Sequence, residues 1–374
     1  MFLARKELWF SKGRFLLIGF IIVLVAWLVF ILSGLGNGLS DLGAATIRYI
    51  EMDTVLFQDE SEFSLTKSVL SEDLVNEANQ LPGVEDAAAI GTTPGSIILG
   101  DSTNDSNKKT SVMLTGIEVG SFLEPEVIAG NGLDTENLNK VIANETLIDE
   151  GFAIGDLITI AGTDIELEIS GFAENETLNH LPVVYMSMST FREYKYAVPG
   201  SDMGVKDPIN AVFVKGTNLD NEEMVENLEG IEAANKKETL NAIPGYQAEN
   251  ATITMMLGFL ILISAVVIAV FFYVLTTQKV HQFGVLKAIG ASNGFVIGSV
   301  IAQVFLLSSI SIMIGIGLTY LTAMVLPEGM PFNLLPHLVI NYSLILLAIS
   351  LFGSLFSVRK IIKIDPLTAL GRAE

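Results

Sequence analysis

The chain alternates between long uncharged apolar stretches and long polar stretches. Four stretches contain no charged residue, namely residues 15–40, 250–278, 288–327 and 329–358. A helix needs about 20 apolar residues to cross the hydrocarbon core of a bilayer, and each stretch is long enough to do so. We therefore predict four transmembrane helices, at residues 15–36, 253–276, 296–326 and 338–357.

The number of crossings depends on the stretch 288–327, which is long enough for one long helix or for two short ones. Basic residues near the ends of transmembrane helices favour the cytoplasm. They flank both ends of the hydrophobic region, at Arg5, Lys6, Lys12, Arg14, Arg359, Lys360, Lys363 and Arg372. Both termini are therefore expected in the cytoplasm, which requires an even number of crossings and thus a single helix in 288–327.

This topology makes residues 1–14 a cytoplasmic N-terminal segment, 277–293 a cytoplasmic loop and 358–374 a cytoplasmic tail. The first apolar stretch also resembles the core of a cleaved signal peptide. Its length and the weak cleavage context after it favour an uncleaved anchor. We expect a multi-pass protein of the plasma membrane.

Residues 37–250 are then extracellular, and their local patterns alternate between strand and helix. Short β-branched runs predict strands at 54–59, 111–117, 156–162, 165–172, 181–187 and 210–216. Amphipathic helices are predicted at 71–84, with Ser71 as the N-cap, and at 220–231. The predicted fold is a membrane protein with four transmembrane helices in a 1+3 arrangement. A large α+β extracellular domain of two subdomains lies between the first and second spans.

Charge follows the same division of the chain. Residues 37–250 contain 38 of the 42 acidic residues and 11 of the 21 basic ones, which gives this domain a formal charge of −27. We expect the lipid membrane, and no nucleic acid, as a partner of the chain. The absence of cysteine excludes disulfides and thiolate or iron–sulfur chemistry.

The sequence contains no recognisable catalytic motif. It has no phosphate-binding G-x-x-x-x-G-K-[ST] loop and no H-E-x-x-H. Its three histidines, His180, His281 and His337, are far apart along the chain. We therefore predict no catalytic residue, no metal site and no intrinsic cofactor, and a membrane-anchored enzyme is the hypothesis with least support.

The cytoplasmic loop 277–293 carries a short helix that ends at a glycine. Val280, Phe283, Leu286 and Ile289 recur at three-residue spacing, and we expect them on one helix face. Such a face can dock into a groove on a soluble partner. A turn held at the membrane surface by lysines fits the pattern equally well, so periodicity leaves both interpretations open.

The segment FGVLKAIGAS (283–292) resembles the corresponding loop of FtsX/MacB-type permeases, the type VII ABC transporters. The 1+3 arrangement, the closing IDPLTALG (364–371), and the stretches 74–90 and 141–162 extend the likeness over the whole chain. The resemblance implies that ATP is bound by a separate ATPase subunit. It also assigns coupling to that ATPase to Val280, Phe283, Leu286, Lys287, Ile289 and Gly290.

Within this family, the chain resembles permeases of the hemin exporter type (Hrt). The segments that carry this likeness are residues 1–18, 245–251 and 271–290. The resemblance implies a homodimer with two copies of the ATPase. It also implies that heme entering from the membrane is expelled outward.

Heme iron is bound in proteins by His, Met, Tyr or Cys side chains. The candidates for heme binding at the outer membrane boundary or in the extracellular domain are Tyr49, Glu51, Met52, His180 and Tyr246. Each also has a simpler role available, since interfacial tyrosines are common, a methionine can fill a core and a glutamate can be solvated.

Two glycine pairs, Gly34 with Gly38 and Gly294 with Gly298, have the spacing that lets transmembrane helices approach closely. Two further functions stay open beside heme export. A permease of this family could instead carry an antimicrobial peptide or a lipid-like compound. A non-transporting permease could use the ATPase to activate a cell-wall hydrolase through its extracellular domain.

Overall fold

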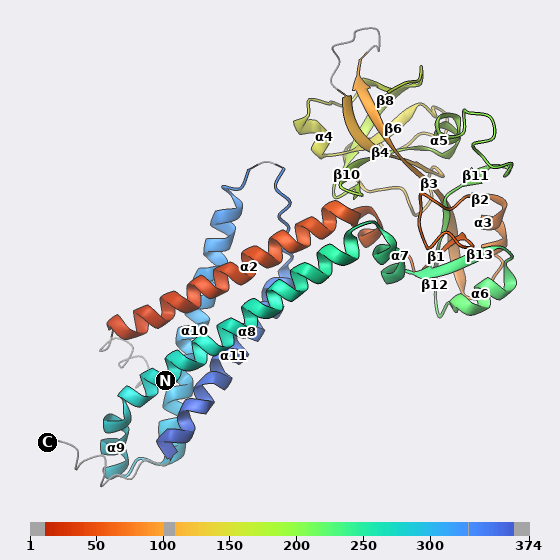
Figure 1. Ribbon diagram of the computed structural model, residues 1–374. Helices are drawn as coiled ribbons and strands as arrows, with labels where there is room; N and C mark the ends of the chain where they lie inside the picture. The colour runs from red at the N-terminus through yellow and green to blue at the C-terminus, as the bar shows by residue number, and fades with distance from the viewer. Residues whose placement is uncertain (1–11, 101–108, 328, 363–374) are drawn as a thin grey trace. The chain divides into compact units, whose positions relative to one another are not determined.

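The computed structural model describes residues 12–100, 109–327 and 329–362 (Figure 1). The chain divides into two compact units, which we call the helical unit (Met1–Gly38 and Ala251–Glu374) and the sheet domain (Leu39–Asn250). Most of the expected N-terminal segment and the tail motif at 364–371 lie outside the described residues.

Four long helices are long and apolar enough to cross a membrane, as the charge-free stretches predicted. They are α2 (Lys12–Tyr49), α8 (Tyr246–Gln278), α10 (Asn293–Ala323) and α11 (Pro336–Ile362), and a short helix, α9 (Val280–Ala288), separates α8 from α10. The stretch 288–327 holds one membrane helix, as parity predicted. Both α2 and α8 reach further than their predicted windows, because a helix ends with its backbone hydrogen bonds and not where its side chains become polar.

Close packing joins α2 to α10 within the helical unit. A Cβ atom added to Gly315 of α10 would lie 2.8 Å from the Cβ of Ala26 on α2. The indole N–H of Trp27 on α2 donates a hydrogen bond to the hydroxyl of Thr322 on α10 at 3.0 Å. Small residues at helix contacts allow this approach, so these two helices form a tightly packed pair.

The glycine pairs expected at helix contacts have other surroundings. Gly34 and Gly38 of α2 face the segment between α10 and α11, where a Cβ at Gly38 would lie 2.4 Å from the carbonyl carbon of Pro331. A Cβ at Gly294 or Gly298 would meet no other described atom within 4 Å beyond its own helix. The contact predicted at Gly34 and Gly38 is therefore made with a segment outside the helices, whereas the helix contact at Gly294 and Gly298 stays a prediction, because the spacing fixes a shared face but not what that face meets.

The sheet domain is built on one mixed sheet in which 11 strands are described. The strand order is β13-β1-β12-β3-β4-β10-β6-β8-β5, with β7 beside β3 and β8, and with β9 beside β10. The long strand β3 pairs with β12 near one end and with β4 and β7 toward the other. The two expected subdomains are therefore halves of one continuous sheet. The main bounds are β1 (Thr54–Gln58), β3 (Val84–Leu99), β4 (Lys109–Ile117), β5 (Val127–Gly130), β6 (Lys140–Asn144), β7 (Leu157–Ile160), β8 (Glu166–Ala173), β9 (Thr177–Leu178), β10 (Leu181–Ser187), β12 (Ala211–Gly216) and β13 (Ile231–Asn235).

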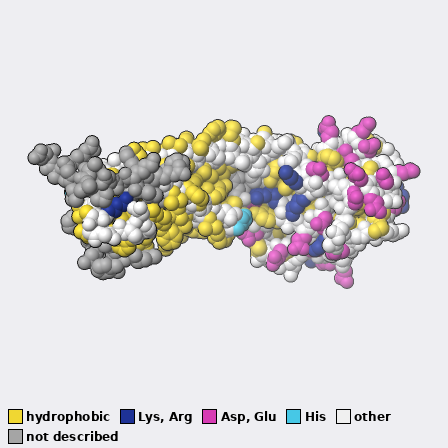
Figure 2. Space-filling view, turned by 90° about the horizontal axis from the view of Figure 1, so that it is seen from below, with side chains coloured by type: hydrophobic (Ala, Val, Ile, Leu, Met, Phe, Trp, Pro, Cys, Tyr) yellow, Lys and Arg dark blue, Asp and Glu magenta, His cyan; other side chains and the backbone are white. Residues whose placement is uncertain are grey.

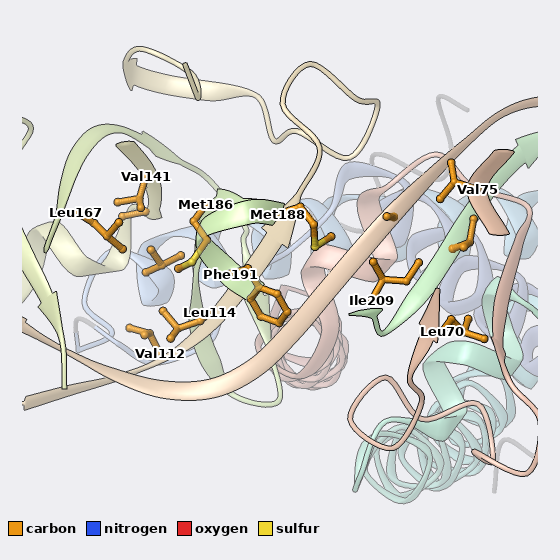
Figure 3. Packing of buried hydrophobic residues seen from close by; sticks show 14 of the residues in the cluster. Leu70, Val75, Val112, Leu114, Val141, Leu167, Met186, Met188, Phe191 and Ile209 are labelled. Atoms are coloured by element: carbon orange, nitrogen blue, oxygen red, sulfur yellow. The ribbon is translucent and has the colours of Figure 1, made fainter. Parts of the chain in front are cut away.

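Both faces of this sheet are covered, because alternate residues of a strand point to opposite sides. Val112 and Leu114 of β4 lie in one buried cluster, together with residues of the domain's short helices (Figure 3), whereas Met113 lies in the other. The second cluster includes Ala44 from α2 and Tyr246 from α8. The short helices are α3 (Asp73–Ala78), α4 (Thr146–Asp149), α5 (Met188–Lys195), α6 (Asn221–Asn227) and α7 (Lys236–Ala242).

Two of these helices, α6 and α3, can be compared with the helix starts predicted from the sequence. α6 begins directly after Asp220, whose carboxylate accepts a hydrogen bond from the N–H of Glu222 at 3.0 Å. α3 begins after Glu72, so the N-cap predicted at Ser71 is wrong. Ser71 belongs instead to β2 (Leu70–Ser71), which pairs with β11 (Pro208–Ile209).

Helix α2 is broken at Ala44, whose φ of −159° and ψ of 26° are not helical. A break of this kind leaves the carbonyls before it without their intrahelical donors. The carbonyls of residues 41–43 accept instead from a short loop of the sheet domain. The donors are the hydroxyl of Thr177 at 2.7 Å, the N–H of Asn179 at 2.8 Å and the N–H of His180 at 3.1 Å. We call residues 176–180 the bracing loop.

The first residue of the bracing loop, Glu176, ties α2 to the sheet on the other side of the break. Its carboxylate accepts hydrogen bonds from the hydroxyl of Thr46 on α2 at 2.9 Å and from the hydroxyl of Tyr185 on β10. Burial raises the pKa of Glu176 to about 7, although both hydrogen bonds act to lower it. This carboxyl therefore titrates near neutral pH at the point where α2 joins the sheet.

The raised pKa of Glu176 predicts how stability changes with pH. Because the folded state holds the proton more tightly than the unfolded one, this group stabilises the fold below its ordinary pKa of 4.5 and loses that effect as pH rises through about 7. The difference corresponds to about 3 kcal/mol in the free energy of unfolding. Glu176→Gln, which keeps an acceptor oxygen, should therefore gain thermal stability over the wild type as pH rises from 5 to 8.

The measurement is the unfolding temperature of the full chain in detergent at both pH values. Glu174→Gln removes an exposed carboxyl two residues away and serves as the matched control. An equal advantage of Glu176→Gln at pH 5 and pH 8, or the same trend in the control, would contradict the assignment.

Candidate functional site

Helix α9 occupies the loop between α8 and α10 and ends at Gly290. Gly290 has a φ of +99°, a left-handed conformation that suits glycine. The N–H of Ala291 closes the helix end by donating to the carbonyl of Leu286 at 2.9 Å. A new helix, α10, then starts after Ser292, whose hydroxyl accepts from the N–H of Phe295 at 3.2 Å.

The residues expected on one face of α9 point in different directions. Phe283 is only 2% exposed and lies in the buried cluster of the helical unit, and Leu286 packs against the same cluster. Val280 is half-buried, whereas Ile289 is 76% exposed. Each step of three residues falls about 60° short of a full turn, so three steps carry Ile289 about 180° away from Val280. The expectation of a single contact face is therefore wrong.

The exposed surface of α9 is formed by other residues than the predicted face. Val285 and Ile289 are exposed apolar residues near its end, and Gly290 is exposed beside them. Lys287 is half-buried. The polar His281 lies exposed in the first turn.

Lys279 is buried at the corner between α8 and α9. Its ammonium group donates a hydrogen bond to the side-chain oxygen of Gln303 on α10 at 3.1 Å. It also lies 4.7 Å from the centre of the Phe15 ring on α2. Sequence reasoning missed this residue because a lysine in a loop is ordinarily solvated.

The five heme candidates separate into two groups within the sheet domain. Tyr49 and Glu51 line an open cleft of about 400 Å³. The hydroxyl of Tyr49 donates to the carboxylate of Asp41 at 3.0 Å, and Glu51 forms an ion pair with Lys215 at 2.7 Å. The hydrogen bond from Lys215 lowers the pKa of Glu51.

The cleft combines an apolar wall with many carboxyl groups. Its apolar residues are Ile50, Phe122, Leu123, Pro125 and Ile128, and its carboxyl groups are Glu51, Glu124, Glu126, Glu174 and Glu176. Glu124 has a structural role, because its carboxylate accepts hydrogen bonds from the backbone N–H groups of Gly120 and Leu133 at 2.8 and 2.9 Å. The cleft can therefore accommodate an apolar surface, while its field disfavours anionic groups.

The other three candidates lie elsewhere. Met52 and Tyr246 are 7% and 8% exposed and belong to the buried cluster on one face of the sheet. Tyr246 and His180 flank Gly43, where an added Cβ would lie 3.4 and 3.9 Å from their rings. The Nε2 atom of His180 lies 3.5 Å from the carboxylate of Glu249. Neither Met52 nor Tyr246 can reach a ligand without opening the core.

The described part of the chain offers little support for a metal site. Among those residues, no three His, Cys, Asp or Glu side chains stand close enough to hold a metal ion. Figure 2 shows acidic side chains gathered over the sheet domain and hydrophobic ones over the helical unit. The sites that the structure offers are thus an exposed helix end at α9 and an acidic, partly apolar cleft beside the end of α2.

Two protein-family models match this chain. Residues 254–366 match the FtsX-like permease C-terminal model, and residues 15–230 match the MacB-like periplasmic core domain model. Together the two matches include all four long helices and most of the sheet domain.

Curated relatives match over the full length. A protein of Staphylococcus haemolyticus, "Putative hemin transport system permease protein HrtB", is 27% identical over 100% of both chains. A Staphylococcus epidermidis protein of the same name is 28% identical over 99% of both.

Two solved structures resemble part of the fold. The periplasmic region of MacB from Actinobacillus actinomycetemcomitans aligns with a TM-score of 0.37 and 15% identity, over 51% of this chain and 92% of that one. The extracellular domain of the transporter YknZ from Gram-positive bacteria aligns with a TM-score of 0.35 and 14% identity, over 49% of this chain and 100% of that one. The assignment rests on the family models, which account for the membrane helices and the sheet domain together. The chain is therefore a multi-pass membrane protein that belongs to the FtsX/MacB-type permeases of ABC transporters.

Proposed function

We propose that this chain is the permease subunit of a complex that exports heme, using ATP hydrolysed by a separate ATPase subunit. The observation that carries the proposal is the full-length similarity to two relatives named as hemin transport permeases. The complex contains a homodimer of this chain and two copies of the ATPase, and it lies in the plasma membrane with both termini in the cytoplasm.

Heme is apolar and planar and carries two anionic propionates. The cleft beside the end of α2 supplies an apolar wall together with Tyr49, whose side chain is 44% exposed and whose phenolic oxygen suits iron. Lys215, the ion-pair partner of Glu51, lies in the same cleft and suits a propionate. The surrounding carboxylates weaken retention of the anionic ligand, and this favours release over storage.

This assignment narrows the set of heme residues to Tyr49 and Glu51. Met52 and Tyr246 are buried in the core of the sheet domain, so they support the fold. His180 does not line this cleft, and its imidazole Nε2 lies 3.5 Å from the carboxylate of Glu249. A carboxylate and a phenol at an exposed cleft stay hydrated until the ligand arrives, which avoids the cost of an unpaired buried charge.

Deleting the gene and scoring growth tests the function as a whole. The deletion should sensitise cells to hemin and leave their resistance to a panel of antimicrobial peptides unchanged, and the wild-type gene should restore growth. Peptide sensitivity would favour the peptide or lipid-like substrate. A cell-separation defect without hemin sensitivity would favour control of a cell-wall hydrolase.

Purification through a tag on this chain tests the energy supply. An ATPase should co-purify, and the isolated chain should hydrolyse no ATP, because its sequence lacks a phosphate-binding loop. Turnover by the isolated chain, or the absence of any co-purifying ATPase, would contradict the proposal.

The heme assignment predicts a selective loss of binding. Replacing Tyr49 with Phe and Glu51 with Gln in one variant removes the phenol and the charge but keeps the shapes of both side chains. Titration of the purified chain with hemin should then give no Soret shift, and the variant gene should fail to restore hemin resistance.

Tyr246→Phe is the matched control, because it removes a phenol that is buried in the core. It should bind hemin as the wild type does. Loss of the Soret shift in the control, with full binding by the double variant, would move the site to the group around Gly43.

The exposed end of α9 predicts where the ATPase docks. A double variant, Val285→Asp with Ile289→Asp, should reduce the amount of co-purified ATPase by about tenfold or more. The reason is that one buried apolar contact at an interface contributes on the order of 1–2 kcal/mol to binding. Membrane insertion, measured by the yield of the chain in the membrane fraction, should be unchanged.

Phe283→Leu is the control on the same helix, because its side chain is buried in the helical unit. ATPase recovery should stay near the wild-type level. The reverse outcome, with Phe283→Leu losing the ATPase and the aspartate variant retaining it, would show that the partner binds the opposite face.

A further inference from the structure

The carboxyl group of Glu176 uses one oxygen for the fold and leaves the other open to the cleft. Glu176 lies three residues after β8 and lines the cleft together with Tyr49 and Glu51. The hydroxyls of Thr46 and Tyr185 both donate to its Oε2 atom. Within the described part of the chain, Oε1 receives no hydrogen bond, and it is not a buried atom. Oε1 is therefore accessible to a ligand in the cleft.

The bonds to Oε2 fix where this open oxygen lies. Thr46 and Tyr49 are three residues apart in the last turn of α2, so their side chains share a helix face. The bond from Thr46, at 2.9 Å, holds Glu176 beside the turn that presents Tyr49 to the cleft. Tyr185 holds the same carboxyl group from β10. Oε1 is thus a positioned polar atom within the candidate ligand site.

The two protonation states of Glu176 offer opposite interactions to a ligand carboxylate. With a proton on Oε1 the group is neutral, and its O–H donates a hydrogen bond. Without the proton it is an anion that can only accept. Two carboxyl groups in close contact hold one proton between them, because both cannot ionise there. The first state therefore binds a ligand carboxylate, and the second repels it.

The change between these states takes place at physiological pH. Burial raises the pKa of Glu176 to about 7, against the effect of the hydrogen bonds from Tyr185 and Thr46. Burial also raises the pKa of Tyr185, so this phenol keeps its proton near neutral pH. The proton that Glu176 loses passes from Oε1 to water in the open cleft.

The charged neighbours of Glu176 strengthen the contrast between the two states. The other carboxyl groups that line the cleft are Glu51, Glu124, Glu126 and Glu174. Lys215, the base in the cleft, is paired with Glu51 at 2.7 Å, and Arg48 in the last turn of α2 is paired with Asp41. Ionisation of Glu176 therefore adds a negative charge to a cleft whose field already disfavours anions.

A purely structural role would not require an ionisable group at this position. An amide has the same shape, accepts hydrogen bonds from the same hydroxyls and costs less free energy to bury than a carboxylate. The tie between α2 and β10 is therefore available to a glutamine. What a glutamic acid adds is a change of charge beside the ligand.

We propose that Glu176 is the proton-controlled release residue of the cleft: its protonated Oε1 binds a carboxylate of the ligand, and loss of that proton to water expels the ligand. The inference rests on the proposed function, in which heme with its two propionates occupies the cleft. It adds the group that sets how tightly the cleft holds an anionic ligand.

The test titrates the purified full chain in detergent with hemin at pH 6 and pH 8 and follows the Soret shift. The affinity of the wild type should fall about tenfold, because the protonated fraction of Glu176 falls from about 0.9 to about 0.1. The propionates stay ionised throughout, since an ordinary carboxyl has a pKa of about 4. Glu176→Gln is neutral at both pH values, so its affinity should change less than about twofold.

Two controls isolate the charge at this position. Glu145→Gln removes a half-buried carboxyl whose pKa is also raised by burial but which does not line the cleft. It should keep the tenfold fall. Hemin dimethyl ester keeps the iron and the ring but has no carboxylate, so the wild type should bind it equally at both pH values. Effects of pH on hemin itself are common to all variants and cancel in the comparison.

A measurement on the wild type decides the question if Glu176→Gln does not fold or binds no hemin. In weakly buffered solution at pH 7, binding should take up about half a proton per hemin, because Glu176 is half protonated before binding and fully protonated after it. Binding of the dimethyl ester should take up none. Equal proton uptake with hemin and with its ester overturns the proposal.

The remaining outcomes separate this inference from the proposed function. The same pH dependence in the wild type and in Glu176→Gln overturns the role of Glu176 while leaving heme export in place. Absence of hemin binding by the wild type at both pH values contradicts the heme assignment and this inference together. A tenfold fall that requires Glu176, in a protein whose gene has no effect on hemin resistance, supports the role of Glu176 and contradicts heme export.

Discussion

The break in α2 at Ala44 is the constraint on which the sheet domain's candidate site depends. Three backbone carbonyls before the break lose their helical donors, and a buried carbonyl without a donor is costly. The bracing loop 176–180 supplies the three missing donors. Two of its residues, Asn179 and His180, adopt positive φ values of 51° and 62°, conformations that cost on the order of 1 kcal/mol each and that the hydrogen bonds to α2 offset.

The consequence of this bracing is the position of the residues that follow the break. After it, Ala44 packs into the buried cluster on one face of the sheet, and Tyr49 and Glu51 reach the acidic cleft. Glu176 closes the arrangement, since it bonds both α2 and β10 and also lines that cleft. A carboxyl with a pKa of about 7 at this point makes the join between helix and sheet sensitive to physiological pH.

The sequence predicted the architecture well because long-range context barely affects the signals concerned. Uncharged windows and the distribution of basic residues were enough for four membrane helices, and β-branched runs located strands such as 181–187. The prediction of the site residues required knowing which side chains are buried, and the spacing of residues along the sequence does not determine this. Phe283 is buried and Ile289 is exposed, because residues spaced three apart rotate progressively around a helix. Ser71 does not cap a helix because it pairs within a β-strand. Lys279 and Tyr246 are buried through contacts with residues far away in sequence, and no local pattern signals such contacts.

Polar contacts hold α2 at several points along its length. Near its start, the Phe15 ring faces the buried ammonium of Lys279, and near its end the bracing loop holds the break. Between them, Gly315 of α10 packs closely against Ala26, and the Trp27 indole donates a hydrogen bond to the hydroxyl of Thr322 at 3.0 Å. Because the directional bond at Trp27 lies beside the close packing at Ala26, a shift of α2 along α10 would disrupt both contacts together.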